Sequence, residues 1–311
     1  MNGLREAGNA EYGIRLMVPA GWQIDNREML YGAEKEGYLS VSVTSAPTGA
    51  NGTLAAWAQR LQDWFTESFV KDAYKIIGIT PVEISGVRGQ VQEVRYTYGD
   101  KWITEYEVMV QKNGYRYYLE YAVPEGQEAT AASWKKVLES VEIDYEAVPE
   151  NFGRIGEEGF LTDKTRMSAK SSRTYRYHID IPKYWEPVRD QFEQENIEYA
   201  FAGGRFEIAV QKDTTAEYLV SQLKRYYNET TSLPGASVKL QGIEQTKVAG
   251  VPAVSFNVHQ VKNGIEYTTR ELVFENGGIT YTIITTLNDA NATEAQQAAL
   301  DRTLSSFEFV K

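Results

Sequence analysis

The chain has 311 residues, of which 42% are hydrophobic and 24% charged, a composition typical of a globular protein with two ordinary domains. Its formal net charge of −11 argues against general nucleic-acid binding, because neutralising phosphates requires a basic surface. The absence of cysteine excludes disulfides, thiol nucleophiles and cysteine-ligated metal sites. No apolar run approaches the roughly 18 to 20 residues that a membrane span requires.

Residues 1–12 are polar, which predicts that no signal peptide lies within the sequence itself. We expect an exported, extracytoplasmic protein whose signal or lipid anchor is not part of this sequence, and a cytoplasmic location is the alternative. Contact with a membrane would then arise only through that missing N-terminal anchor. We expect a monomer or a weak dimer.

Two segments begin alike and predict an internal duplication. One strand-like run leads into Pro19 and Trp22, and a second leads into Pro182 and Trp185. The offset is 163 for the prolines and for the tryptophans. We therefore predict that the two tryptophans occupy equivalent, buried places over one end of a sheet.

Turn dipeptides continue the same register further along the chain. Asn113-Gly114 matches Gly277-Gly278 at an offset of 164, and two-residue hairpin turns of this kind demand positive φ. Apolar and aromatic residues then alternate with the same parity in both copies, at Tyr115, Tyr117, Leu119 and Tyr121, and at Ile279, Tyr281, Ile283 and Thr285. A period of two indicates equivalent strands.

Helices are predicted between the strands of each copy. Thr53 precedes large apolar residues at three- and four-residue spacing up to Phe69, and residues 214–217 form a capping-box pattern in the second copy. Each copy closes with a helix, at 133–140 and 294–305, and a short strand. The predicted order is three strands, a helix, several hairpin-linked strands, a helix and a strand, which an antiparallel α+β sheet with flanking helices satisfies.

The predicted domains are residues 1–148 and 175–311, joined by a linker at 149–174. Glycine and serine are frequent in the linker. Its apolar residues predict that part of it packs on a domain; they are Phe152, Ile155, Phe160 and Leu161.

The strand ending Val18-Pro19-Ala20-Gly21-Trp22, the Gly86-Val87 turn and the closing Ser306-Phe307-Glu308-Phe309 together resemble the PsbP-like superfamily, which includes DcrB-type bacterial proteins. The resemblance implies a tandem pair of α/β/α sandwich domains. It also implies an exported or lipid-anchored protein that acts by binding other proteins, and it supplies no catalytic residues. The chain departs from the photosystem member in being duplicated and in lacking a basic N-terminal arm, which puts a photosynthetic role in doubt.

Few residues are candidates for chemistry. His178 and His259 are interpreted as surface or cross-strand histidines, and Gly203-Gly204 as a hairpin turn rather than a phosphate loop. Glu105 and Glu107 share a strand face and would raise one pKa if buried together. The favoured interpretation is that both are solvated, with Arg95 or Lys101 across from them.

Tyrosine is frequent, at 21 residues, and it gathers on the strands of the first copy. A sheet core with its solvated face explains most of this enrichment. The alternative is an exposed aromatic interaction surface, with Tyr118 as its first candidate because it points opposite to Tyr117. The candidate interaction surface comprises Tyr98, Glu105, Glu107 and Tyr118.

We therefore predict a non-enzymatic binding or scaffold protein with a protein partner, no catalytic residues, no cofactor and no metal. Residues 1–150 carry 14 Lys and Arg against 22 Asp and Glu, so the first copy is predicted to be the interacting one. The alternative is a hydrolase or a divalent-cation-binding protein that uses acidic residues of the first domain or of a cleft between the domains.

Overall fold

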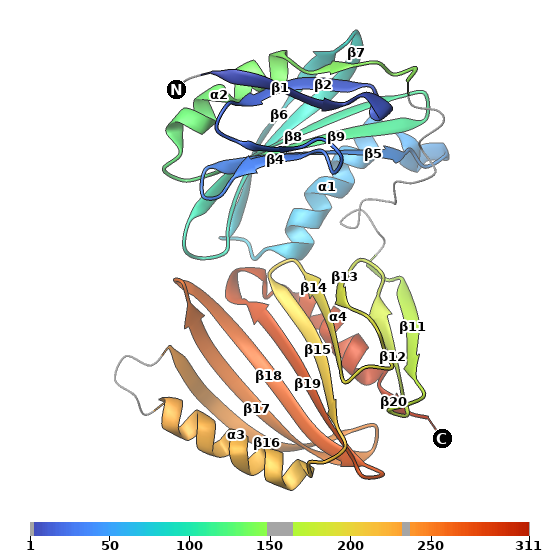
Figure 1. Ribbon diagram of the computed structural model, residues 1–311, viewed down its shortest axis with the longest axis vertical. Helices are drawn as coiled ribbons and strands as arrows, with labels where there is room; N and C mark the ends of the chain where they lie inside the picture. The colour runs from blue at the N-terminus through green and yellow to red at the C-terminus, as the bar shows by residue number, and fades with distance from the viewer. Residues whose placement is uncertain (1–2, 148–163, 232–236, 311) are drawn as a thin grey trace. The chain divides into compact units, whose positions relative to one another are not determined.

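The computed structural model describes residues 3–147, 164–231 and 237–310 (Figure 1). The chain forms two compact units. The first comprises residues 1–65, 74–97 and 101–161, and the second comprises residues 66–73, 98–100 and 162–311.

Within its described residues the first unit contains ten strands, helix α2 and all of helix α1 except its last three residues. In chain order they are β1 (Leu4–Asn9), β2 (Ile14–Pro19), β3 (Gln23–Asp25), β4 (Leu30–Ala33), β5 (Gly37–Ser45), α1 (Leu54–Ser68), β6 (Tyr74–Ile84), β7 (Val87–Thr97), β8 (Trp102–Lys112), β9 (Tyr115–Pro124), α2 (Glu128–Glu139) and β10 (Glu142–Ile143).

The second unit repeats this order. Its elements are β11 (Met167–Ser172), β12 (Tyr177–Pro182), β13 (Glu186–Arg189), β14 (Asn196–Phe201), β15 (Gly204–Gln211), α3 (Ala216–Thr231), β16 (Val238–Val248), β17 (Val251–Lys262), β18 (Ile265–Asn276), β19 (Ile279–Asn288), α4 (Glu294–Ser305) and β20 (Glu308–Phe309).

The two units share one sheet topology. The large antiparallel sheets have the orders β3-β4-β5-β9-β8-β7-β6 and β13-β14-β15-β19-β18-β17-β16, and the small sheets have the orders β1-β2-β10 and β11-β12-β20. Register repeats as well, because Tyr106 pairs with Tyr121 and Arg270 pairs with Thr285, both at an offset of 164. The predicted duplication and the α+β fold class are confirmed.

Turn and capping residues account for the ends of the elements. Asn113 and Gly114 have φ of 55° and 82°, so the Asn-Gly dipeptide forms the predicted tight turn between β8 and β9. The hydroxyl of Thr53 accepts from the amide of Ala56, 3.1 Å away, at the start of α1. Thr293 caps α4 in the same way, since its hydroxyl accepts from the amide of Gln296.

Both faces of each large sheet are covered. In the first unit α1 packs on one face through Trp57 and Leu61, and the small sheet and α2 cover the other face. In the second unit α3 packs on one face through Tyr227, and the small sheet and α4 cover the other. The strands of each large sheet therefore bury both alternating sets of side chains along much of their length.

Trp22 and Trp185 are both buried, with 1% and 3% of their surface exposed. The ring of Trp22 stacks on Tyr121 at 5.5 Å, and that of Trp185 lies 5.5 Å from Phe206. The predicted burial of both tryptophans is confirmed.

The structure corrects three details. Five strands precede α1 rather than three. Helix α2 begins at Glu128, five residues before the predicted start. Strand β11 lies within the predicted linker and pairs with β12, so the second unit begins before residue 175.

The apolar linker residues Phe152, Ile155, Phe160 and Leu161 lie outside the described residues. Among the helices that the structure describes, none is both long and apolar enough to span a membrane.

Candidate functional site

Three glutamates gather on the α1-facing side of the first sheet. Glu105 and Glu107 lie two residues apart on β8, and Glu120 on β9 is directly opposite Glu107. Glu105 and Glu107 are 4% and 1% exposed. Like charges opposite each other on neighbouring strands destabilise a sheet, so the three glutamates cannot all be ionised without cost.

Neutral side chains donate hydrogen bonds to each of the three carboxyl groups, and Glu105 and Glu107 also bond each other. The hydroxyl of Tyr118 donates to Oε1 of Glu107 at 3.0 Å, and the amide of Gln92 donates to Oε2 at 2.7 Å. The hydroxyl of Tyr96 donates to Glu105 at 2.8 Å, and that of Tyr38 donates to Glu120. We call Glu105, Glu107 and Glu120 the carboxyl cluster.

Burial raises the pKa of each carboxyl group of the cluster, because a charged carboxylate loses its hydration there. For Glu107 the pKa rises to about 8, although the bonds from Tyr118 and Gln92 oppose the shift. The pKa of Glu105 lies well above its usual range, since the charges of Glu120 and Glu107 add to the effect of burial. With a pKa of about 8, Glu107 is largely protonated at neutral pH.

The expectation that Glu105 and Glu107 are solvated beside Arg95 or Lys101 is wrong. Arg95 pairs with Thr104, so strand alternation places it on the opposite face of the sheet from Glu105. Its guanidinium lies 5.4 Å from the ring of Trp102 instead. Lys101 is exposed just before β8.

The expectation that Tyr118 is exposed is also wrong. Tyr118 is 3% exposed and lies under α1, with its ring 6.0 Å from that of Trp57. Tyr98 follows β7 and is partly buried, with its ring 5.6 Å from Phe69. The four residues predicted as an interaction surface therefore do not form one exposed patch.

The second unit retains one carboxyl group of the cluster. Glu271 occupies the place of Glu107 and is buried, and the hydroxyl of Tyr227 on α3 donates to it at 2.9 Å. Burial and the charge of Glu207 raise the pKa of Glu271. Phe256 pairs with Glu271 across the strands, whereas Gln92 pairs with Glu107 in the first unit. The environment of the Glu271 carboxyl group is therefore more apolar.

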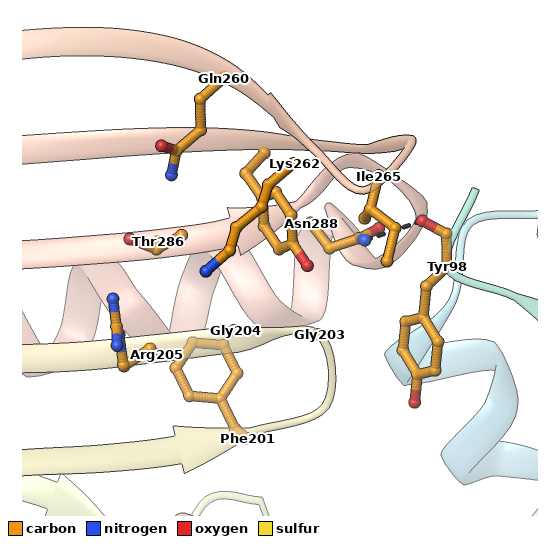
Figure 2. Close-up of a pocket in the computed structure, with 11 residues that line it drawn as sticks. Tyr98, Phe201, Gly203, Gly204, Arg205, Gln260, Lys262, Ile265, Thr286 and Asn288 are labelled. Carbon is orange, nitrogen blue, oxygen red and sulfur yellow. Dashed lines mark hydrogen bonds between the residues drawn. The ribbon is translucent and has the colours of Figure 1, made fainter. Parts of the chain in front are cut away.

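The surface of the second unit is hollowed where β14, β15 and the ends of β17, β18 and β19 meet (Figure 2). The hollow has a volume of about 470 Å³. Arg205, Gln260 and Lys262 come from β15 and β17 and project into the same space as Thr286 on β19 (Figure 2). Two cations and two hydrogen-bonding groups therefore converge in one place.

Glycine residues shape this hollow. The turn between β14 and β15 consists of Ala202 and Gly203, the latter at φ of 68°, and Gly204 begins β15, so the segment is a hairpin as predicted. A side chain at Gly204 would collide with the ring of Phe201, which lines the hollow. Gly204 therefore lets an aromatic wall lie close to the polar groups.

Ion pairs hold Arg205 in position. Its Nε lies 2.6 Å from Glu207, and one terminal nitrogen lies 3.4 Å from Glu198. Half of the Arg205 side chain is still exposed, at 51%. Lys262 is exposed at the end of β17 and supplies the second positive charge.

A hollow of about 910 Å³ lies at the corresponding place in the first unit. It is lined by the hairpin of β4 and β5 and by Pro124 at the end of β9, together with Asp25, Leu30 and Glu34. The repeat relates the lining residues Gly37 to Gly204, Tyr38 to Arg205 and Pro124 to Asn288, as the strand registers show. The two units therefore share the location of a hollow and differ in its charge.

The two histidines are partly exposed, as predicted for surface or cross-strand positions. Nδ1 of His178 lies 3.1 Å from the hydroxyl of Ser171, and Nε2 lies 3.4 Å from Asp180. A catalytic triad requires a histidine buried and oriented by its partners, and these three side chains lie on an open strand surface. His259 faces two carboxylates, Glu266 and Asp289.

Sequence reasoning missed Arg205, Gln260 and Lys262, which lie on strands far apart in the chain. The one sequence feature that could have pointed to the hollow was the Gly203-Gly204 pair, and it was interpreted only as a hairpin turn.

No protein-family model matches the chain, and no curated protein matches it. Among solved structures, cyanobacterial PsbP from Synechocystis matches 46% of this chain and 94% of its own, with 14% identity and a TM-score of 0.35. The T6SS immunity protein TplEi from Pseudomonas aeruginosa matches 99% of this chain and 97% of its own, with 10% identity and a TM-score of 0.27.

A Bacteroides thetaiotaomicron protein matches 44% of the chain with 16% identity and a TM-score of 0.31, and the match spans 46% of that protein's length. These three structures are 10 to 16% identical to the chain, with TM-scores of 0.27 to 0.35.

Proposed function

We propose that the chain is a non-catalytic binding protein with one recognition site in each unit, formed by the two repeat-related hollows. The observation that carries the proposal is that the hollows lie at the same topological place while their charges differ. Two sites on one chain raise the apparent affinity for a partner that engages both, without any new chemistry.

The chemistry of the second hollow favours an acidic ligand. Lys262 offers an exposed positive charge, and Arg205 adds a half-exposed guanidinium that also pairs with Glu207 and Glu198. Gln260 and Thr286 offer hydrogen bonds, and Phe201 offers an aromatic wall. A peptide in which an acidic side chain stands beside an aromatic one fits this combination, because guanidinium and ammonium groups bind carboxylates in charge-assisted hydrogen bonds. The first hollow has two carboxylates, Asp25 and Glu34, against one lysine, Lys35, and so favours a basic segment of the same partner.

The alternative of a hydrolase based on Glu105 and Glu107 gains no support from their geometry. A general acid or base must come within hydrogen-bond reach of the reacting group. Both carboxyl groups lie beneath α1 and are occupied by tyrosine and glutamine side chains. Turnover of an ester or glycoside substrate that disappears in Glu107→Gln would favour the hydrolase over the binding protein.

Fluorescence anisotropy with a labelled Ser-Glu-Phe-Glu-Ser peptide tests the second site. The whole molecule carries a net charge of −11 and repels anions, so an acidic peptide binds only where cations converge. We expect Lys262→Glu to weaken binding about tenfold or more, since it replaces attraction by repulsion.

Lys224→Glu is the matched control, because Lys224 is an exposed lysine on α3 outside the residues that line the hollow. It makes the same change in net charge and is expected to leave the affinity almost unchanged. Equal weakening by both variants, or no effect of Lys262→Glu, would show that the hollow is not the binding site.

A further inference from the structure

A second cluster of polar side chains lies at the end of the large sheet in the second unit. His259 comes from β17, Glu266 from β18, and Asp289 directly follows β19. Nε2 of His259 lies 3.4 Å from an oxygen of Glu266 and 3.5 Å from Oδ2 of Asp289. One ligand atom from each of the three residues falls within 4.8 Å of the others.

These separations match the edges of a metal coordination shell. Zinc binds nitrogen and oxygen ligands at about 2.0 to 2.2 Å in tetrahedral geometry, so neighbouring ligand atoms lie roughly 3.3 to 3.6 Å apart. The two measured histidine–carboxylate separations fall in this range. They are also long for direct hydrogen bonds, whose usual lengths are about 2.7 to 3.2 Å.

A neighbouring side chain orients one of the carboxylates. The hydroxyl of Thr268 donates to Oδ1 of Asp289 at 3.2 Å, which leaves Oδ2 directed toward His259. Hydrogen bonds of this kind to a ligating group fix its position and are typical of metal sites. The histidine side chain is 24% exposed and the carboxylates 60% and 44%, so an ion can reach the cluster from solvent.

The first unit provides an internal comparison. By strand register Arg95 takes the place of His259 and Trp102 takes the place of Glu266. There the guanidinium of Arg95 lies over the Trp102 ring at 5.4 Å. The same corner of the fold thus holds a cation–aromatic contact in one copy and three potential metal ligands in the other.

We propose that His259, Glu266 and Asp289 bind one divalent transition-metal ion, with zinc as the reference ion and water completing the coordination. One imidazole with two carboxylates suits zinc and its first-row neighbours better than calcium, which prefers a shell of oxygen ligands. The ion would also stiffen the adjacent hollow, because Gln260 and Tyr267 line it and directly follow His259 and Glu266 in the chain.

Isothermal titration of the tag-free, full-length protein with zinc chloride at pH 7.5 tests the proposal. We expect one saturable site, which His259→Ala abolishes and Asp289→Asn weakens at least tenfold. We expect Thr268→Val to weaken it by about tenfold, since it removes only the hydrogen bond that orients Asp289. Circular dichroism of each variant establishes that the fold is retained.

His178→Ala is the matched control. His178 also lies 3.4 Å from a carboxylate, that of Asp180, so a simple histidine–carboxylate pair exists at both places. Zinc binding that survives His178→Ala and disappears in His259→Ala supports the three-ligand site.

Either a bound metal ion or a protonated His259 could balance the charges of Glu266 and Asp289. NMR of the histidine side chains distinguishes these two cases. Zinc should shift the His259 resonances at a one-to-one ratio, and calcium should not. The proposal is overturned if zinc leaves His259 unshifted, if calcium binds equally well, or if His259→Ala binds zinc as the native protein does.

Discussion

Replacing Glu107 by glutamine should make the first unit more stable at alkaline pH and leave it nearly unchanged at pH 4 to 5. The pKa of Glu107 is about 8 in the folded protein, against 4.5 for an unperturbed glutamate. A group whose pKa is raised on folding stabilises the native state fully below its unfolded pKa. That stability is lost as the pH rises toward and through the folded pKa.

The size of the effect follows from the shift. One pKa unit corresponds to about 1.36 kcal/mol, so the loss between pH 4.5 and pH 8 amounts to about 5 kcal/mol at most. Glutamine cannot ionise and avoids this loss. Oε1 of Gln92 is buried without a hydrogen-bond partner, so a reversed Gln92 amide would accept from a glutamine at position 107.

Urea denaturation at pH 5, 7 and 9, followed by tryptophan fluorescence, measures the effect. Trp185 is the tryptophan of the second unit, and the other five lie between residues 22 and 134, so the signal reports mainly on the first unit. Glu142→Gln is the control, because Glu142 is exposed and pairs with Arg15 at the surface. A stability difference between Glu107→Gln and the native protein that is the same at all three pH values would refute the reasoning.

Three further variants test other parts of the structure. Trp22→Ala should destabilise the first unit by about 3 to 5 kcal/mol, since it leaves a large cavity against Tyr121, and differential scanning calorimetry would contradict a core role if the melting temperature did not change. Trp185→Ala should do the same in the second unit. Tyr118→Phe should cost about 1 to 2 kcal/mol, because the bond to Glu107 is lost, and the Glu107 pKa measured by NMR should rise further; a lower pKa would contradict the assigned bond.

Local sequence signals predicted much of the fold because they act over a few residues. The Asn113-Gly114 turn, the Thr53 cap and the alternation after each hairpin turn depend on backbone preferences that the chain itself specifies. A strand as short as β3, with three residues, shows no period, so the number of strands before α1 could not be predicted.

The burial of Glu105 and Glu107 could not be predicted from alternation alone. A polar residue that alternates with apolar ones normally faces solvent, and that rule holds only when one face of a sheet is open. Here α1 covers the second face, so Glu107 and Tyr118 meet beneath it. Where a helix lies on a sheet is decided by packing between segments distant in sequence, which a local pattern does not contain.

Comparison of the two copies separates what the fold requires from what each unit has acquired. The buried carboxyl group is present in both, at Glu107 and Glu271, yet its tyrosine partner comes from β9 in one unit and from α3 in the other. A carboxyl group kept while its partner changes is expected if the sheet position itself has a role, because burying an ionisable group without need costs stability. The residues that line the hollows differ between the units by contrast. Tyr38 and Arg205, for example, occupy equivalent places in hollows of different charge. This division favours the carboxyl positions as determinants of stability and pH response, and the hollows as the place where the two units differ in charge.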